Sequence, residues 1–183
     1  MAKLSLISVL ENAAAKAKDS GSMIAFFIPQ DVASQIQKMF GNIDGDMVEP
    51  KDMHITLGLV HNYSGNEKKI STILDKFCAR HKPFSVSVRS FATFPPNEHN
   101  EHKHILYAEP EADEIYDIRN HLFSVMKKYG INIDNGGHNE YKPHITIKYC
   151  DEQPDVNKQE QFSFGLDKLS FAVGDKRHSE RLG

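Results

Sequence analysis

The sequence predicts a single domain of the α/β or α+β class, and two observations lead to this prediction. Between Met23 and Val173, short apolar runs of strand length alternate with longer stretches whose apolar residues recur at helical spacing. No low-complexity tract or long linker divides the 183 residues, a length that suits one domain of roughly 150 residues. Apolar residues make up 39% of the chain, which is enough for a packed core and excludes an intrinsically disordered protein.

Residues 1–22 are expected to form a helical extension before the domain. Their apolar residues follow one helical stripe, made of Leu6, Ile7, Leu10, Ala13 and Ala14. A cleaved signal peptide is the alternative, but its apolar stretch Leu4–Leu10 is at the lower limit of roughly 7–15 residues, and Glu11 ends it abruptly. We therefore interpret this segment as a helix that lies on the domain or on a partner.

The domain is expected to span residues 23–176 and to begin with a strand, a helix and a loop. Met23–Ile28 is an uninterrupted apolar run that Pro29 ends, which is typical of a buried strand. Asp31–Phe40 predicts a helix, because its apolar residues fall on one helical face. Gly41–Lys51 contains two glycines, Pro50 and several acidic residues, and therefore predicts a loop.

The middle of the chain repeats this alternation of strands and helices. Strands are predicted at Met53–Val60 and in the alternating segment Pro83–Phe94, and a helix at Ser64–Arg80. A polar loop, residues 95–103, then leads into a strand at His104–Ala108.

The last third of the chain is expected to contain one helix and two strands. Asp113–Tyr129 has apolar residues three and four positions apart, which predicts the third helix. His144–Tyr149 and Leu169–Val173 predict strands. Residues 177–183 are expected to be a C-terminal tail.

Charge and cysteine content exclude several classes of protein. The net charge of −3 argues against a broad basic surface for long duplex DNA. No apolar run approaches the roughly 20 residues that span a membrane. Cys78 and Cys150 are too few for a disulfide framework or a four-thiolate zinc site. We expect two buried free thiols and a reducing compartment, the cytoplasm.

One four-residue pattern occurs twice and indicates chemistry. His54-Ile55-Thr56-Leu57 and His144-Ile145-Thr146-Ile147 both read histidine, apolar, threonine, apolar. The chain has four threonines, and two of them follow a histidine by two positions. Chance produces this repetition on the order of once in a thousand sequences, so the pair is far more specific than a single short motif.

On a strand this spacing places the histidine and the threonine on the same face, because side chains alternate with period two. Strict alternation adds Gly58 to the face of His54, where it would leave room for a substrate, and Lys148 to the face of His144. It places Tyr149 on the opposite face, in the core.

A pair of histidines suits acid–base catalysis at phosphorus. An imidazole titrates near pH ~6.5, so one ring can accept a proton while the other donates one. Threonine hydroxyls can donate hydrogen bonds to the non-bridging phosphate oxygens. Lys148 and Lys142 could add positive charge, and Tyr141, in the loop before the second motif, could stack on a base. This chemistry needs no metal ion and no cofactor.

The tandem motif resembles that of the 2H phosphoesterase superfamily, which includes RNA 2′,3′-cyclic phosphodiesterases and 2′-5′ RNA ligases. The two motifs lie 90 residues apart, a spacing usual for that family, and the resemblance extends over about Met23–Val173. It implies an α+β fold of two pseudo-symmetric, mainly antiparallel sheets around a central cleft, with helices outside. It also implies that His54, Thr56, His144 and Thr146 are the catalytic residues.

The expected function is that of a metal-independent phosphodiesterase acting on RNA ends or small nucleotides with a 2′,3′-cyclic phosphate or a 2′-5′ linkage. Reversal of the second reaction would be 2′-5′ RNA ligation. One alternative is a phage anti-defence enzyme that cleaves cyclic oligonucleotide messengers, as similar phage proteins do. An alternative of another class is a non-catalytic nucleotide-binding or phage structural protein.

Overall fold

The computed structural model describes residues 21–98, 100–137, 140–156 and 160–183. The helix expected before residue 20 and the choice between extension and signal peptide lie outside these residues. The described strands are β1 Ser22–Phe27, β2 Asp46–Met47, β3 His54–His61, β4 Phe84–Phe94, β5 His104–Glu111, β6 Asn132–Asp134, β7 Ile145–Cys150, β8 Phe162–Leu166, β9 Lys168–Val173 and β10 Lys176–Arg181. The described helices are α2 Gln30–Met39, α3 Glu67–Cys78, α4 Asp113–Lys128 and the short 3₁₀ helix η1 Pro50–Asp52.

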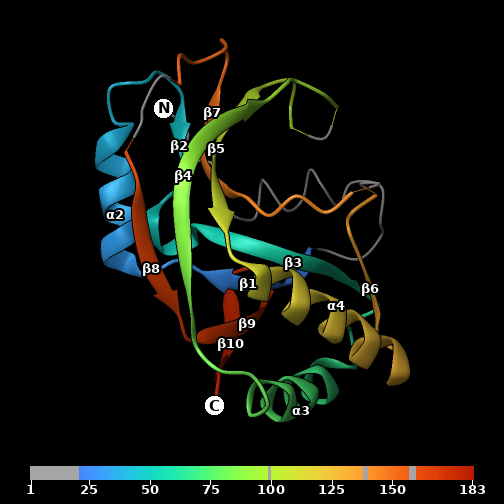
Figure 1. The fold of residues 1–183 in the computed structure, drawn as a ribbon. Coiled ribbons are helices and arrows are strands. Elements are labelled where there is room, and N and C mark those ends of the chain that lie inside the picture. Colours follow the sequence, from blue (N-terminus) through green and yellow to red (C-terminus); the bar gives the residue numbers. More distant parts are fainter. Residues whose placement is uncertain (1–20, 99, 138–139, 157–159) are drawn as a thin grey trace.

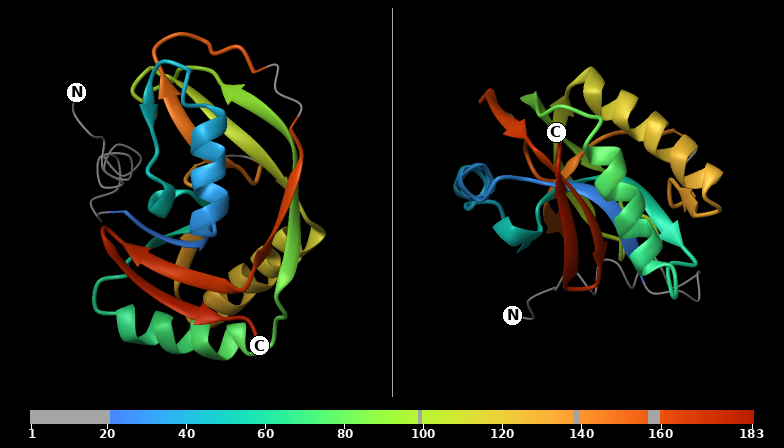
Figure 2. Two further views of the ribbon diagram at one scale, coloured as in Figure 1. Left: turned by 90° about the vertical axis from the view of Figure 1, so that its left-hand side faces the viewer. Right: turned by 90° about the horizontal axis from the view of Figure 1, so that it is seen from below.

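The strands form one curved antiparallel sheet in the order β10-β9-β1-β3-β7-β5-β4-β8 (Figure 1). The short strands β2 and β6 pair with β7 and β3. Helices α3 and α4 pack beside the half that contains β1 and β3, and α2 packs beside the other half (Figure 2). The fold is therefore α+β, as expected, although the two predicted sheets are joined along β3 and β7.

The two halves repeat the same chain path. The unit β1-α2-β2-β3 is followed by β5-α4-β6-β7, and in each unit the last strand carries one copy of the histidine–threonine motif. The short strands are exchanged, because β2 pairs with the motif strand of the second unit and β6 with that of the first. The expected pseudo-symmetry is thus present in the order and the pairing of the elements.

Hydrophobic burial explains how the two motif strands are oriented in the sheet. Residues 53–60 and 143–150 have the same sequence of buried and half-buried positions. Ile55 and Ile145, the apolar residues between histidine and threonine, are fully buried and pair with each other across β3 and β7. Since side chains alternate, the histidines and threonines turn to the opposite face of the sheet from these isoleucines.

Each motif strand departs from strict alternation directly after its threonine. The pairing of β1 with β3 passes from Thr56 to Gly58, and the pairing of β5 with β7 passes from Thr146 to Lys148. Leu57 and Ile147 are therefore the extra residues of two β-bulges. A bulge reverses the faces that follow it, so the faces assigned from period two to Lys148 and Tyr149 are wrong.

The role expected of Gly58 is a first correction. Gly58 is among the residues that line the cleft of His54, but a Cβ at this position would lie 2.8 Å from side-chain atoms of Phe123 on α4 and of Ile133 on β6. The absence of a side chain therefore allows α4 and β6 to pack closely against β3.

The C-terminal residues are a second correction. Residues 177–183 are not a tail, because β10 pairs along its length with β9. After it, Leu182 and Gly183 donate backbone hydrogen bonds to Asp167 and Cys78. Strands β2, β6 and β8 were not predicted from the sequence either. Both cysteines are buried and free, as expected.

Substitution of Gly58 tests the close packing of α4 on β3. We expect Gly58→Ala to lower the free energy of unfolding by about 1–3 kcal/mol, because the added methyl overpacks a filled space. Gly165→Ala on β8 is the matched control, since nothing lies within 4 Å of its added Cβ. Urea unfolding measures both. Equal stability changes in the two variants would contradict this packing.

Candidate active site

The pairing of β3 with β7 brings the two motifs together. Because the strands are antiparallel and Ile55 is opposite Ile145, His54 comes opposite Thr146, and Thr56 opposite His144. All four side chains line one cleft of about 500 Å³. The structure therefore brings together the four residues that the sequence singled out, from segments 90 residues apart.

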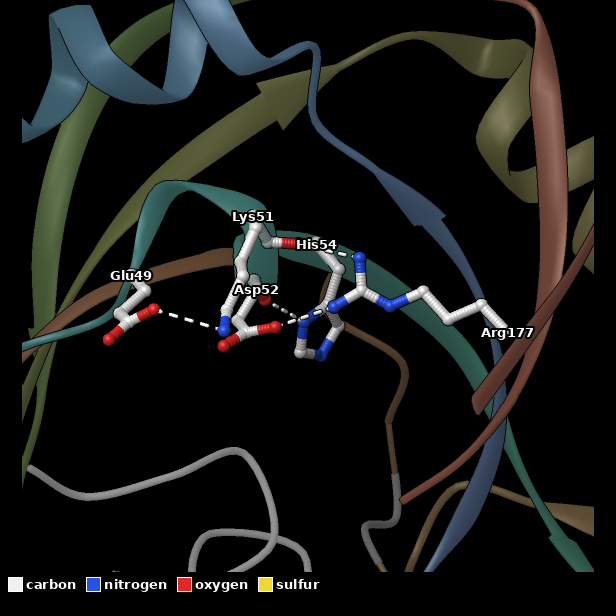
Figure 3. Close-up of polar contacts among 5 residues, drawn as sticks. All are labelled: Glu49, Lys51, Asp52, His54 and Arg177. Carbon is white, nitrogen blue, oxygen red and sulfur yellow. Dashed lines mark hydrogen bonds and ion pairs between the residues drawn. The ribbon is translucent and has the colours of Figure 1, made fainter. Parts of the chain in front are cut away.

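His54 is held in one orientation and one tautomer. Its Nδ1 lies 2.6 Å from the carbonyl oxygen of Asp52, which requires Nδ1 to carry the hydrogen and leaves Nε2 as an acceptor (Figure 3). The ring of Phe27 on β1 lies against the imidazole, with 5.4 Å between ring centroids. Burial lowers the pKa of His54 to about 4, and His144 and Arg177 add to this effect, whereas the hydrogen bond to Asp52 opposes it.

His144 is held in the same way at the second motif. Its Nδ1 lies 2.8 Å from the carbonyl oxygen of Lys142, again two residues earlier in the chain. Phe94 and Tyr107 contact the imidazole edge to face, with centroids 5.1 and 5.8 Å away. In both histidines the backbone hydrogen bond uses Nδ1, so Nε2 is the nitrogen that can act on a ligand in the cleft.

The threonine of the first motif is fixed mainly through its backbone. The hydroxyl of Tyr141 donates to the carbonyl oxygen of Thr56 at 2.9 Å. The Thr56 hydroxyl has a weak 3.8 Å contact with the sulfur of Met23. A contact of this kind leaves the hydroxyl able to turn to a stronger acceptor such as a phosphate oxygen.

Tyr141 lines the cleft, but its contacts show a role in supporting the motif. The guanidinium of Arg119 lies 4.2 Å from the centre of the Tyr141 ring and covers one of its faces. Arg119 also donates from Nε to the carbonyl oxygen of Leu57 at 3.0 Å, which is the bulged residue. Together these two side chains bind the carbonyls of Thr56 and Leu57 and hold the bulge in place.

Lys142 lies at the cleft but is engaged by neighbours. Its ammonium donates to Glu109 and to the hydroxyl of Tyr107, both at 2.7 Å. The Lys142 side chain remains about half exposed, at 53%. It is therefore close enough to add positive charge near His144 without being directed at the centre of the cleft.

Lys148 is not in the cleft, which contradicts its expected place on the face of His144. The bulge at Ile147 turns it to the other side of the sheet, where it is 3% exposed. There its ammonium donates to the carbonyl oxygens of Phe40 and Ile43, just after the C-terminal end of α2. Tyr149, expected in the core, lines the cleft instead.

Several residues around the motifs carried no signal in the sequence. Asp52, Phe27 and Arg177 surround His54, while Arg119 supports the bulge and Glu109 binds Lys142. Each comes from a different element, so no local spacing relates them to a histidine. Of these residues, only Asp52 could have been singled out from the sequence, because it lies two positions before His54.

Neither a metal centre nor a membrane span is found among the described residues. No group of three or more histidine, cysteine, aspartate or glutamate side chains there could hold a metal ion. No helix in that part of the chain is long and apolar enough to cross a membrane.

Comparisons with known proteins agree with this architecture. Residues 28–176 match the family model described as the 2′-5′ RNA ligase superfamily. Comparison with curated proteins gave no match.

Solved structures share the fold at low sequence identity. The protein TT0787 of Thermus thermophilus is similar with a TM-score of 0.68 and 16% identity, over 89% of this chain and 95% of that chain. E. coli LigT complexed with phosphate gives 0.62 and 14%, over 89% and 94%. The MHV ns2 PDE domain gives 0.60 and 14%, over 84% and 99%. LigT has also been solved with 3′-AMP, ATP and NADP+.

Substitution of Lys148 distinguishes a structural lysine from a phosphate ligand. We expect Lys148→Met to lower the free energy of unfolding by about 1–3 kcal/mol, because it removes the buried ammonium that donates to the carbonyls of Phe40 and Ile43 and takes away a cation at a helix C-terminus. Nucleotide affinity of the folded protein, measured by calorimetry, should stay unchanged. Lys127→Met, on the exposed end of α4, is the control for loss of a surface lysine. A lost affinity with unchanged stability would contradict this assignment.

Proposed function

The chain belongs to the 2′-5′ RNA ligase superfamily, and we propose that it is a metal-independent 2H phosphodiesterase acting on RNA ends or small nucleotides. The observation that carries this proposal is the cleft in which His54, Thr56, His144 and Thr146 meet, with each imidazole oriented through its Nδ1. The phosphate, 3′-AMP and other nucleotides bound by E. coli LigT support a nucleotide as the ligand.

The proposed reaction is the opening of a 2′,3′-cyclic phosphate, or of a 2′-5′ linkage, by two proton transfers. One imidazole takes a proton from the attacking water or hydroxyl while a new P–O bond forms. The other donates a proton to the leaving oxygen as the old P–O bond breaks. The hydroxyls of Thr56 and Thr146 donate hydrogen bonds to the non-bridging oxygens, where negative charge is held. For a 2′-5′ linkage the attacking group is the neighbouring 3′-hydroxyl, and the products are a 2′,3′-cyclic phosphate and a free 5′-hydroxyl. The reverse of this second reaction, attack of a 5′-hydroxyl on the cyclic phosphate with departure of the 3′-oxygen, is 2′-5′ ligation.

The environments of the histidines support a division of roles. In the free protein His54 is neutral above about pH 4, because burial lowers its pKa. A neutral imidazole with Nε2 unprotonated is ready to accept a proton. We therefore assign His54 as the base and His144 as the acid in the hydrolytic direction, with the roles exchanged in the reverse reaction.

The size and charge of the cleft favour a small substrate. Acidic residues outnumber lysines in its lining, which would repel an extended polyanion. This favours a short RNA end or a small nucleotide over long duplex DNA, and it keeps cyclic oligonucleotides among the candidates. We keep the cytoplasm as the expected compartment.

A hydrolysis panel tests the function. It contains nucleoside 2′,3′-cyclic phosphates, 2′-5′- and 3′-5′-linked dinucleotides, and cyclic di- and trinucleotides, each with and without EDTA. We expect turnover of one substrate class, unaffected by EDTA, and a loss of about 10²–10⁴-fold in kcat for His54→Ala and for His144→Ala. The double variant should lose about as much as either single variant, because the two residues act as a unit.

His178→Ala is the control for that panel, since His178 pairs with Glu180 on β10 and lies outside the cleft lining. It should retain full activity. Nucleotide binding without turnover of any substrate would favour the non-catalytic alternative, and activity that EDTA abolishes would contradict a metal-independent mechanism.

The assignment of base and acid is tested by leaving group and by pH. A nitrophenyl phosphodiester has a leaving group that needs no proton, so it should restore much of the activity of His144→Ala but not that of His54→Ala. The acidic limb of the kcat/KM profile should lie well below pH 6.5, because the pKa of His54 in the free protein is about 4 and the base is lost only as pH falls through that value. Rescue of His54→Ala instead of His144→Ala would reverse the assignment.

A further inference from the structure

Arg177 on β10 reaches the short helix η1, which lies just before His54 in the chain (Figure 3). Its Nη1 donates to the carbonyl oxygen of Lys51 at 2.6 Å, and its Nη2 lies 2.5 Å from a carboxylate oxygen of Asp52. The guanidinium thus binds the backbone and a side chain of the short helix η1. The side chains of Arg177 and Asp52 are 27% and 15% exposed, so this charge-assisted contact is partly shielded from water.

The short helix that Arg177 binds also orients the imidazole of His54. The carbonyl oxygen of Asp52 accepts the hydrogen of His54 Nδ1 at 2.6 Å, so a shift of η1 would move the partner that fixes the ring. Arg177 therefore acts on His54 through Asp52 and not by direct contact. Arg177 itself is absent from the cleft lining, which separates it from a phosphate-binding residue.

Phe27 provides a second connection between Arg177 and His54. The guanidinium carbon lies 3.7 Å from the centre of the Phe27 ring, and the Phe27 and His54 rings lie 5.4 Å apart. Phe27 and His54 are also directly paired across β1 and β3. Phe27 is therefore enclosed between the two side chains and limits rotation of the imidazole.

The second motif has the same arrangement, made from other elements. The carbonyl oxygen of Lys142 accepts the hydrogen bond of His144, and the Lys142 ammonium pairs with Glu109. The same ammonium lies 5.0 Å from the centre of the Tyr107 ring, and this ring contacts His144. An ion pair and an aromatic ring thus support each histidine. At His144 the cation comes from the segment that enters the motif's own strand, whereas at His54 it comes from the C-terminal strand.

We propose that Arg177 is a positioning residue for His54: from β10 it holds η1 and Phe27 so that the imidazole keeps Nε2 directed into the cleft in its neutral form. This inference rests on the proposed function for its kinetic consequences and on geometry alone for its structural ones. It gives the C-terminal strand a role in catalysis.

The charged and titratable groups around His54 decide how Arg177 acts on its protonation. They are Asp52 from η1, His144 just before β7 and Arg177 from β10. Burial is the main cause that lowers the pKa of His54, and the positive charge of Arg177 acts in the same direction to a smaller extent. Removal of Arg177 should therefore move the pKa of His54 upward, toward the ordinary value of 6.5.

The experiment compares Arg177→Met, Arg177→Lys and the double variant Asp52→Asn/Arg177→Met with the wild type. Methionine can still contact Phe27 but removes the charge and the hydrogen bonds, and the double variant avoids leaving the partly buried Asp52 carboxylate without its partner. Arg181→Met is the matched control, since Arg181 lies on the same strand and its 77% exposed side chain pairs only loosely, at 3.8 Å, with Asp167.

Two readouts are measured on folded protein. The first is the NMR titration of His54, assigned by its loss in His54→Gln, which needs no enzymatic activity. We expect its midpoint to rise in both methionine variants at position 177 and to stay in place in Arg181→Met. The second is kinetic. We expect kcat to fall by about 10²-fold in Arg177→Met with little change in KM, and the acidic limb of kcat/KM to move to higher pH. Arg177→Lys should restore part of the lost kcat and part of the shift in the acidic limb.

Unchanged titration of His54 in the methionine variants overturns the proposal. So does a rise in KM at constant kcat, which would make Arg177 a substrate-binding residue, or a loss of activity that follows the folded fraction in circular dichroism. If the wild type hydrolyses no phosphodiester, the proposed function fails, while the NMR titration still decides whether Arg177 controls His54.

Discussion

The pairing of Ile55 with Ile145 is the contact on which the site depends. It is the single registered pair between β3 and β7, and it joins the two halves of the sheet. Both isoleucines are fully buried, so hydrophobic burial fixes which face of each strand turns inward. A slip of one residue would move every motif side chain to the other face. The register that fills the core is therefore the register that assembles the two histidines and two threonines.

The bulges after Thr56 and Thr146 divide each motif strand into two functions. Before the bulge the polar residues turn to the cleft, and after it the face is reversed. Gly58 and Lys148 occupy equivalent positions after the bulges, and both serve packing: one admits α4, the other binds the carbonyls that follow α2. Each motif strand thus presents its histidine and threonine to the cleft at one end and anchors a helix of the fold at the other.

Charge in the cleft is arranged by pairing. Six acidic residues contribute to its lining, namely Asp46, Glu49, Asp52, Glu101, Asp134 and Glu140. Lys103, Lys51, Arg177 and His61 pair with four of them. On the proposed function, a phosphodiester between the motifs would meet hydroxyl and imidazole donors, and these pairs offset part of the negative charge around it. Because Lys148 binds the carbonyls after α2, stabilisation of the phosphate would then fall mainly to the threonines and histidines.

The parts of this molecule that follow a regular period could be predicted from sequence. The helices and the two motif strands were predicted because burial repeats along them, and the four catalytic candidates because their motif occurs twice. The faces of Lys148 and Tyr149 were wrong because a bulge leaves no mark in an apolar–polar pattern. Strand β10 was missed because Lys-Arg-His-Ser-Glu-Arg contains no apolar residue, as suits an exposed edge strand. Arg177 belongs to that strand, so its relation to His54 exists only in three dimensions.

The pseudo-symmetry of the fold is broken in the surroundings of the two motif histidines. Both imidazoles receive the same backbone hydrogen bond and the same aromatic contact, so geometry alone would make them equivalent. Their surroundings differ: His54 is enclosed near Arg177, whereas His144 lies beside the half-exposed Lys142. A reaction with one base and one acid needs two groups whose environments favour different protonation states. A duplicated motif supplies the paired geometry, and burial of His54, which lowers its pKa, is the main feature that would fit it for the role of base.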